Sequence, residues 1–212
     1  MTPPLPGGLA CSVAFTGHAV VATARPEAAV RAQGADGFGA SLAPGFLSWL
    51  AGRGGRIGCV DATLVARGTG RVGTGQVGTE QGASGGDGPS AASPLTERHD
   101  LDAHPRVRHA RELRTGVRVY GDARGLVTLA DGLAGRRELS VELDPSRSPG
   151  PDGSRGHGRA LLRDALALVP AHVPVFAAVS PGNARSLRAF LAAGFVPVGS
   201  EVLISPGPSI AG

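Results

Sequence analysis

Apolar and polar positions alternate regularly along the second half of the chain, in short segments separated by glycine, proline and aspartate. The pattern predicts helices over residues 104–113, 159–169 and 184–193, and strands over 117–121, 125–132, 137–145, 173–180 and 195–204. Short turns at 122–124 and 132–135 make the first three strands an antiparallel meander. This order of elements is typical of an α/β layout with a mixed sheet.

The helix predicted over 159–169 is amphipathic. Its apolar face is made of Leu161, Leu162, Ala165, Leu168 and Val169. Arg159, Arg163 and Asp164 fall on the opposite face, where they are left for solvent or for a ligand. The helix should therefore pack on the sheet by one side and leave the other side free.

The first half of the chain is less regular. A strand with a turn at Gly17 is predicted over 11–24, a helix from about Pro44 to near Gly52, and a strand at the centre of 56–68. Residues 69–94 are rich in glycine and serine and have little to bury, so we expect a flexible loop there. The resulting domain boundaries are an N-terminal extension over 1–68, the loop over 69–94, a core over 95–205 and a loose tail over 206–212.

Composition narrows the class of protein. The 212 residues are 42% apolar, with no apolar run long enough to span a membrane and no secretory signal pattern at the start, so a cytoplasmic location and no membrane partner are expected. The two cysteines, Cys11 and Cys59, lack the spacing of a metal motif and are predicted to be buried thiols rather than a disulfide.

The basic residues are all arginines, and the net charge is +4. The absence of lysine excludes a P-loop, pyridoxal phosphate enzymes and Schiff-base aldolases, because each requires a lysine amine. The arginines are scattered and aromatic residues make up only 4% of the chain, so no nucleic-acid partner is predicted.

One glycine-rich segment raises a chemical possibility. Residues 153–162 read "GSRGHGRALL", with Gly153, Gly156 and Gly158 at the point where a helix must begin. Such glycines form either a flexible turn or a cradle in which backbone N–H groups and the helix dipole hold a phosphate. The spacing alone does not distinguish the two.

The segment from Arg137 to Ile204 resembles the GCN5-related N-acetyltransferase (GNAT) family. The resemblance rests on "VELDPSR", then "GSRGHGRALL", then "VSPGNARSLRAFLAAGF", in which Asn183 precedes the Gly194-Phe195 pair by eleven residues. It implies a mixed, mostly antiparallel sheet flanked by helices. It further implies direct transfer of an acetyl group from acetyl-CoA to a primary amine, either of a small molecule or of a peptide.

The same resemblance implies a set of cofactor-binding residues. They are Val141, Leu143, Ser154, Arg155, Gly156, His157, Gly158, Arg159, Ala160, Asn183, Ser186 and Phe190. The glycine turn would hold the pyrophosphate through backbone N–H groups, and the strand at 139–143 would hold the pantetheine arm. Asn183 is equally explained as the N-cap of the helix at 184–193, and the two roles are compatible.

Two positions depart from the family pattern. Gly153 stands where the family has arginine or glutamine, so Arg147 or Arg155 would supply the charge or the backbone would bind alone. Phe190 stands where many members have a tyrosine that protonates the leaving thiolate, which leaves that step to water or to Tyr120, the only tyrosine. Tyr120 itself is predicted as a half-buried strand residue.

Acetylation of an amine needs a base, because the amine is protonated at neutral pH. Glu138, Ser140 and Glu142 share one face of the strand at 137–143, and Glu142 is the first candidate base with Glu138 second. The alternative is that both are ordinary exposed carboxylates. Together they would also attract a cationic substrate.

The histidines give no strong metal motif. His99, His104 and His109 are spaced five apart, which places no two of them on one helix face, so a solvated loop and helix start is predicted and no metal. His157 would contact the cofactor.

The sequence is also compatible with rival functions. An acyl-CoA-binding sensor or partner-binding module on the same fold would explain Phe190 and Gly153, whereas a dinucleotide-binding oxidoreductase fits poorly because a meander precedes the glycine turn. The acceptor is open among antibiotics, polyamines, amino acids and protein N-termini, and a homodimer is also left open.

Overall fold

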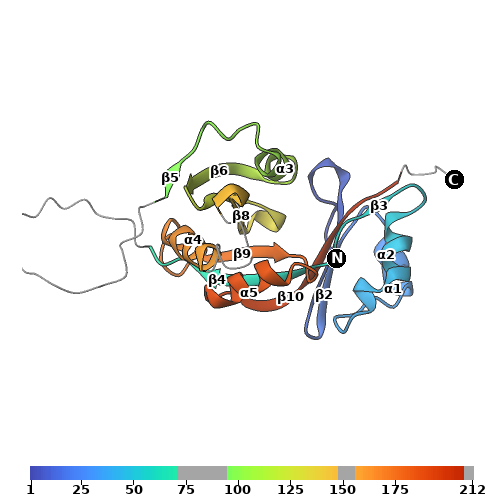
Figure 1. The fold of residues 1–212 in the computed structure, drawn as a ribbon. Helices are drawn as coiled ribbons and strands as arrows, with labels where there is room; N and C mark the ends of the chain where they lie inside the picture. Colours follow the sequence, from blue (N-terminus) through green and yellow to red (C-terminus); the bar gives the residue numbers. More distant parts are fainter. Residues whose placement is uncertain (71–94, 148–155, 208–212) are drawn as a thin grey trace, which may run out of the picture. The chain divides into compact units, whose positions relative to one another are not determined.

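The computed structural model describes residues 1–70, 95–147 and 156–207, coloured along the chain in Figure 1. It divides into two compact units. The terminal unit comprises Met1–Val65 and Phe176–Gly212, and the central unit comprises Ala66–Val175. The division falls within two strands, β4 (Asp61–Arg67) and β9 (Pro174–Val179).

This division differs from the boundaries predicted from composition. The N-terminal residues share the terminal unit with the closing strand β10 (Val196–Ser205), because β1 (Ala10–Phe15), β3 (Arg56–Ile57) and β4 all pair with β10. Strand pairing between distant segments leaves no trace in local composition. The predicted loop at 71–94 and the tail at 208–212 lie outside the described residues.

In the terminal unit the strand order is β2-β1-β10-β4-β9, where β2 is His18–Ala22. The predicted strand at 11–24 is a hairpin of β1 and β2, with Gly17 in its turn at a positive φ of 73°. Glycine adopts that conformation without the steric cost of a Cβ.

Helices complete the terminal unit. They are α1 (Glu27–Ala32), α2 (Pro44–Ala51), α5 (Ala184–Ala192) and the short 3-10 turns η1 (Pro6–Gly8) and η2 (Ala40–Leu42). The helix predicted from Pro44 is confirmed, and α1 was not predicted. Phe46, Leu47 and Leu50 of α2 are buried in one apolar cluster with Val21 and Ile204.

The central unit contains the predicted meander. Its strands are β5 (Thr96–Glu97), β6 (Thr115–Asp122), β7 (Gly125–Asp131) and β8 (Arg137–Leu143), in the order β8-β7-β6-β5 and all antiparallel. The 3-10 turns η3 (Leu133–Gly135) and η4 (Pro145–Arg147) flank β8. The three strands predicted over 117–145 are therefore confirmed.

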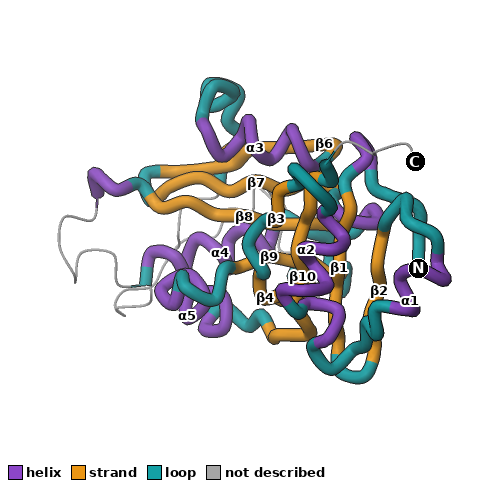
Figure 2. The backbone as a smooth tube through the Cα atoms, turned by 90° about the vertical axis from the view of Figure 1, so that its right-hand side faces the viewer, coloured by secondary structure: helices purple, strands orange, loops and turns teal. Residues whose placement is uncertain are grey.

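Two helices pack on this meander from opposite sides. Figures 1 and 2 show α3 (Pro105–Leu113) on one face and α4 (His157–Ala167) on the other. Both were predicted. The apolar side of α4 buries Leu161, Leu162 and Ala165 as expected, and alternation along β8 sends Glu138, Ser140 and Glu142 to the α3 side.

Three burial predictions were wrong. Leu168 is only half-buried because α4 ends at Ala167, so Leu166 takes its place in the core. Cys59 is exposed, since it lies in the link before β4, whereas Cys11 is buried, and neither cysteine forms a disulfide. Tyr120 is buried rather than half-buried because β5 and β7 flank it on both sides, and this burial raises the pKa of its hydroxyl.

Candidate functional site

Glu142 is the more accessible of the two glutamates on β8. Its side chain is 40% exposed, and its Oε2 accepts a hydrogen bond of 2.6 Å from Nε of Arg106 on α3. Its Oε1 lies 3.9 Å from Nε2 of His104, which is longer than a hydrogen bond. One oxygen is therefore held by a guanidinium while the other keeps room for a further donor.

His104 is the N-cap of α3, at the predicted helix start. Its Nδ1 accepts a hydrogen bond of 3.2 Å from the backbone N–H of Arg106, and Pro105 occupies the first helical position. Since Nδ1 acts as an acceptor, the neutral ring carries its hydrogen on Nε2, which faces Glu142. The N-cap position of His104 therefore places its imidazole ring near Glu142, the candidate base.

Glu138 lies in a different environment from Glu142 although both are on β8. It is 6% exposed and accepts hydrogen bonds from Nε of Arg114 at 2.5 Å, Nε of Arg136 at 2.8 Å and the N–H of Leu133 at 3.0 Å. Burial raises the pKa of Glu138, but the two guanidiniums lower it by more than burial raises it, so the pKa lies below its ordinary range. A buried, fully bonded carboxylate is a poor proton acceptor, which leaves Glu142 as the better candidate.

The expected attraction of cations to this face is opposed by neighbouring arginines. The two carboxylates are bonded to three guanidiniums, those of Arg106, Arg114 and Arg136. The charge on this side of β8 is therefore neutral to positive. The sequence showed the carboxylates together on one strand, but the arginines come from α3 and from the segments before β6 and β8.

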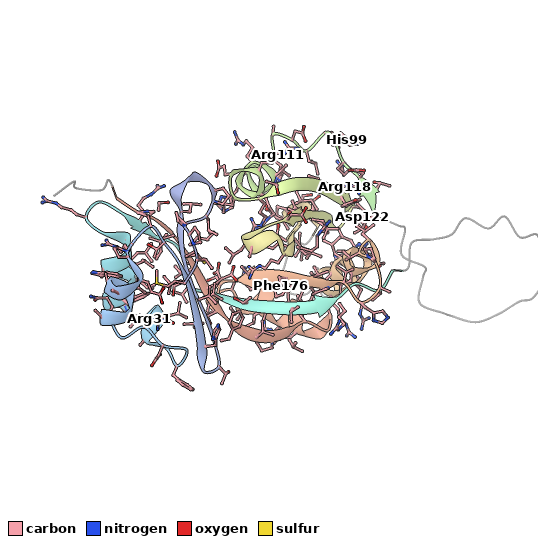
Figure 3. The ribbon with its side chains drawn as sticks, turned by 180° about the vertical axis from the view of Figure 1, so that it is seen from behind. Arg31, His99, Arg111, Arg118, Asp122 and Phe176 are labelled. Carbon is pink, nitrogen blue, oxygen red and sulfur yellow. The ribbon has the colours of Figure 1, made fainter. Side chains whose placement is uncertain are left out.

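Further ion pairs of the same unit lie near Arg111, Arg118 and Asp122, which Figure 3 labels.

Helix α4 begins at a glycine. Gly156 is its N-cap residue at a positive φ of 86°, is exposed, and has no atom of the described residues within 4 Å of the place where a Cβ would stand. Glycine has no side chain to cap the first-turn amides, and no described side chain does so. The amides that follow Gly156 are therefore placed to meet an anion, as at other helix N-termini.

The structure describes four further residues of the predicted phosphate-binding turn, all in the first turn of α4. His157 is half-buried, Gly158 is buried, Arg159 is exposed and Ala160 donates its N–H to the Gly156 carbonyl at 2.8 Å. Ser154 and Arg155 lie outside the described residues, as does Gly153.

On β8, Val141 and Leu143 are half-buried and pair with Val127 and Gly125 of β7. They belong to the central unit, whereas Asn183, Ser186 and Phe190 belong to the terminal unit. The predicted cofactor-binding residues are thus distributed over both units.

Asn183 is the N-cap of α5, as predicted. Its Oδ1 accepts a hydrogen bond of 3.0 Å from the N–H of Ser186. Phe190 is buried and its ring meets that of Phe195 edge to face, with centroids 4.9 Å apart. Phe190 therefore contributes to packing, and this accounts for an apolar residue at its position.

A pair of carboxylates in the terminal unit was missed by the sequence analysis. Asp61 of β4 and Glu201 of β10 are directly opposite each other across the two strands, and the buried Glu201 accepts a hydrogen bond of 2.8 Å from Oγ1 of Thr63. Burial raises the pKa of Asp61, the charge of Glu201 adds to this rise, and a hydrogen bond with Cys59 opposes it. An acidic residue within each of two apolar strands was the available signal.

This pair predicts a pH-dependent effect of Asp61→Asn. Because the folded pKa of Asp61 lies above its unfolded value near ~3.9, ionisation of Asp61 destabilises the fold at neutral pH. The substitution should raise Tm at pH 7, and the gain should shrink as the pH falls and Asp61 becomes protonated. Thermal melts of both proteins from pH 7 to pH 3.5 measure this, and an equal shift at every pH would contradict it.

The described residues were compared with the requirements of a metal site and of a membrane-spanning helix. Within residues 1–70, 95–147 and 156–207 no group of three or more histidines, cysteines or carboxylates could hold a metal ion. In the same residues no helix is both long and apolar enough to cross a membrane. No family model, curated protein or solved structure matches this chain.

Proposed function

We propose that this protein is an N-acetyltransferase of GNAT type, which moves an acetyl group from acetyl-CoA to a primary amine. The observation that carries the proposal is the N-terminus of α4, which no described side chain caps, which follows an antiparallel meander and which begins at a left-handed, exposed glycine. The first-turn amides of a helix and the helix dipole suit the pyrophosphate of coenzyme A. Exposed Arg159 adds a positive charge in the same turn.

The reaction asks little of the protein beyond orientation and proton removal. The amine nitrogen attacks the thioester carbonyl carbon, a C–N bond forms, and the C–S bond breaks with release of coenzyme A as its thiolate. The amine proton goes to Oε1 of Glu142, which has no hydrogen bond among the described residues. The thiolate takes a proton from water, because Phe190 has none to give.

Calorimetric titration with acetyl-CoA tests this proposal. We expect binding to the native chain and a clear loss of affinity in Gly156→Ala, because a Cβ strains the positive φ and disturbs the turn. Gly135→Ala is the matched control, since Gly135 is also exposed, has a φ of 73° and has open space around it. Absence of any acetyl-CoA binding by the native chain would refute the proposal.

A second candidate is an acyl-CoA-binding module without turnover. It is favoured by the engagement of both carboxylates, since Arg106 holds Glu142 and two arginines enclose Glu138. It predicts tight acetyl-CoA binding without release of free thiol across an amine panel. Any acceptor-dependent thiol release would exclude it.

A further inference from the structure

The guanidinium of Arg106 has free donors beside the candidate base. Its Nε is bonded to Glu142, its side chain is 39% exposed, and neither terminal nitrogen has a hydrogen-bond partner among the described residues. By comparison, Arg98, Arg118 and Arg124 each use a terminal nitrogen as well as Nε to hold a carboxylate. Arg106 thus offers its two terminal nitrogens to solvent or to a ligand.

The charge around Arg106 favours an anionic ligand. Among the described residues, Glu142 is the one carboxylate bonded to it, and His104 also faces that carboxylate. Glu138 is already matched by Arg114 and Arg136. A purely cationic substrate such as a polyamine would therefore meet a face on which guanidiniums outnumber carboxylates.

We propose that the acceptor is an amine that also carries a carboxylate, of the amino-acid type, and that Arg106 binds this carboxylate. This inference rests on the proposed function and names its acceptor class. The two terminal nitrogens of a guanidinium match the two oxygens of a carboxylate in a bidentate pair. Arg106 is a specificity-determining residue in this arrangement.

The position of Glu142 fits the amine of the same acceptor. Its Oε2 is 2.6 Å from Nε of Arg106, so the carboxylate of Glu142 and the guanidinium of Arg106 are direct neighbours, and one acceptor with an amine and a carboxylate can contact both. In an amino acid the ammonium and carboxylate groups are separated by a single carbon. Arg106 holds one end of the acceptor while Glu142 receives the proton of the other.

Acetylation of matched acceptors tests the inference. The native chain is assayed for thiol release with amino acids, with the same amino acids as methyl esters, and with the corresponding decarboxylated amines. We expect kcat/KM to be higher for the acids than for the esters. In Arg106→Gln this acid-to-ester ratio should fall by roughly 10- to 100-fold, because a charge-assisted bidentate pair is lost.

Two variants isolate the cause. Arg106→Lys keeps the positive charge but lacks the paired terminal nitrogens of a guanidinium. Its acid-to-ester ratio should therefore lie between those of Arg106→Gln and the native chain. Arg108→Gln removes the same charge from an exposed position on α3 and should leave the ratio unchanged. The use of a ratio cancels any effect of Arg106 on Glu142 itself, and circular dichroism verifies that each variant is folded.

The inference and the proposed function fail in different ways. Turnover of amines with an acid-to-ester ratio near one, unaltered in Arg106→Gln, overturns the inference and leaves the acetyltransferase standing. A second measurement does not depend on turnover. It compares the equilibrium binding of N-acetyl amino acids with that of their methyl esters. If the chain binds these acids in an Arg106-dependent way but transfers no acetyl group, the carboxylate site is supported and the proposed activity is refuted. If the chain neither binds the acids nor transfers an acetyl group, the carboxylate site and the proposed activity are both refuted.

Discussion

Replacing Glu142 by glutamine should lower kcat/KM for amine acetylation by about 10²- to 10⁴-fold, the range that a positioned general base contributes. The amide keeps the size of the side chain and can still accept a hydrogen bond from Arg106, but it cannot take the proton of the amine. Acetyl-CoA affinity should change little, because the proposed pyrophosphate site is at the N-terminus of α4. Steady-state kinetics with thiol detection and calorimetry measure the two quantities.

The matched control for this prediction is Glu112→Gln. Glu112 is an exposed glutamate on α3 whose carboxylate lies 3.4 Å from Nδ1 of His109, so its replacement removes the same charge without touching the candidate base. It should leave the rate near that of the native chain. Equal rates for the native chain and Glu142→Gln would assign proton removal to water or to another group.

The elements of the central unit were predictable because their signals are local. Strict alternation along β8, short turns on either side of β7 and the apolar stripe of α4 each depend on neighbouring residues. The helix α1 escaped prediction because only six residues form it and only Val30 among them is buried. A stretch of that length carries less than two turns of periodicity.

The candidate site was predictable only in part, because its chemistry depends on partners that are distant in sequence. Glu138 and Glu142 are equivalent in a strand pattern, yet the structure distinguishes them through Arg114 and Arg136 on one side and Arg106 on the other. The same holds for the terminal unit. Nothing near Asp61 in sequence indicates that Glu201 is its cross-strand neighbour.

The contrast between the two glutamates leads to a prediction on stability. Replacing Glu138 by alanine should lower the free energy of unfolding by about 3 kcal/mol, because Arg114 and Arg136, whose side chains are 20% and 13% exposed, lose the carboxylate that balances them. Glu138→Gln should cost less, since its oxygen still accepts hydrogen bonds. Urea unfolding at pH 7 measures both, and Glu112→Ala is the exposed control, for which a change within about 0.5 kcal/mol is expected.

The pH dependence of this loss separates the ion pairs from simple packing. The folded pKa of Glu138 lies below its unfolded value near ~4.3, so the stability contributed by its ionised form is fully present above that value. It is lost as the pH falls through the folded pKa. The difference between the native chain and Glu138→Ala should therefore be largest at neutral pH and should shrink in acid. A difference that stays constant from pH 7 to pH 3 would mean that Glu138 stabilises the fold by the volume it fills, and that the two arginines find compensation in solvent.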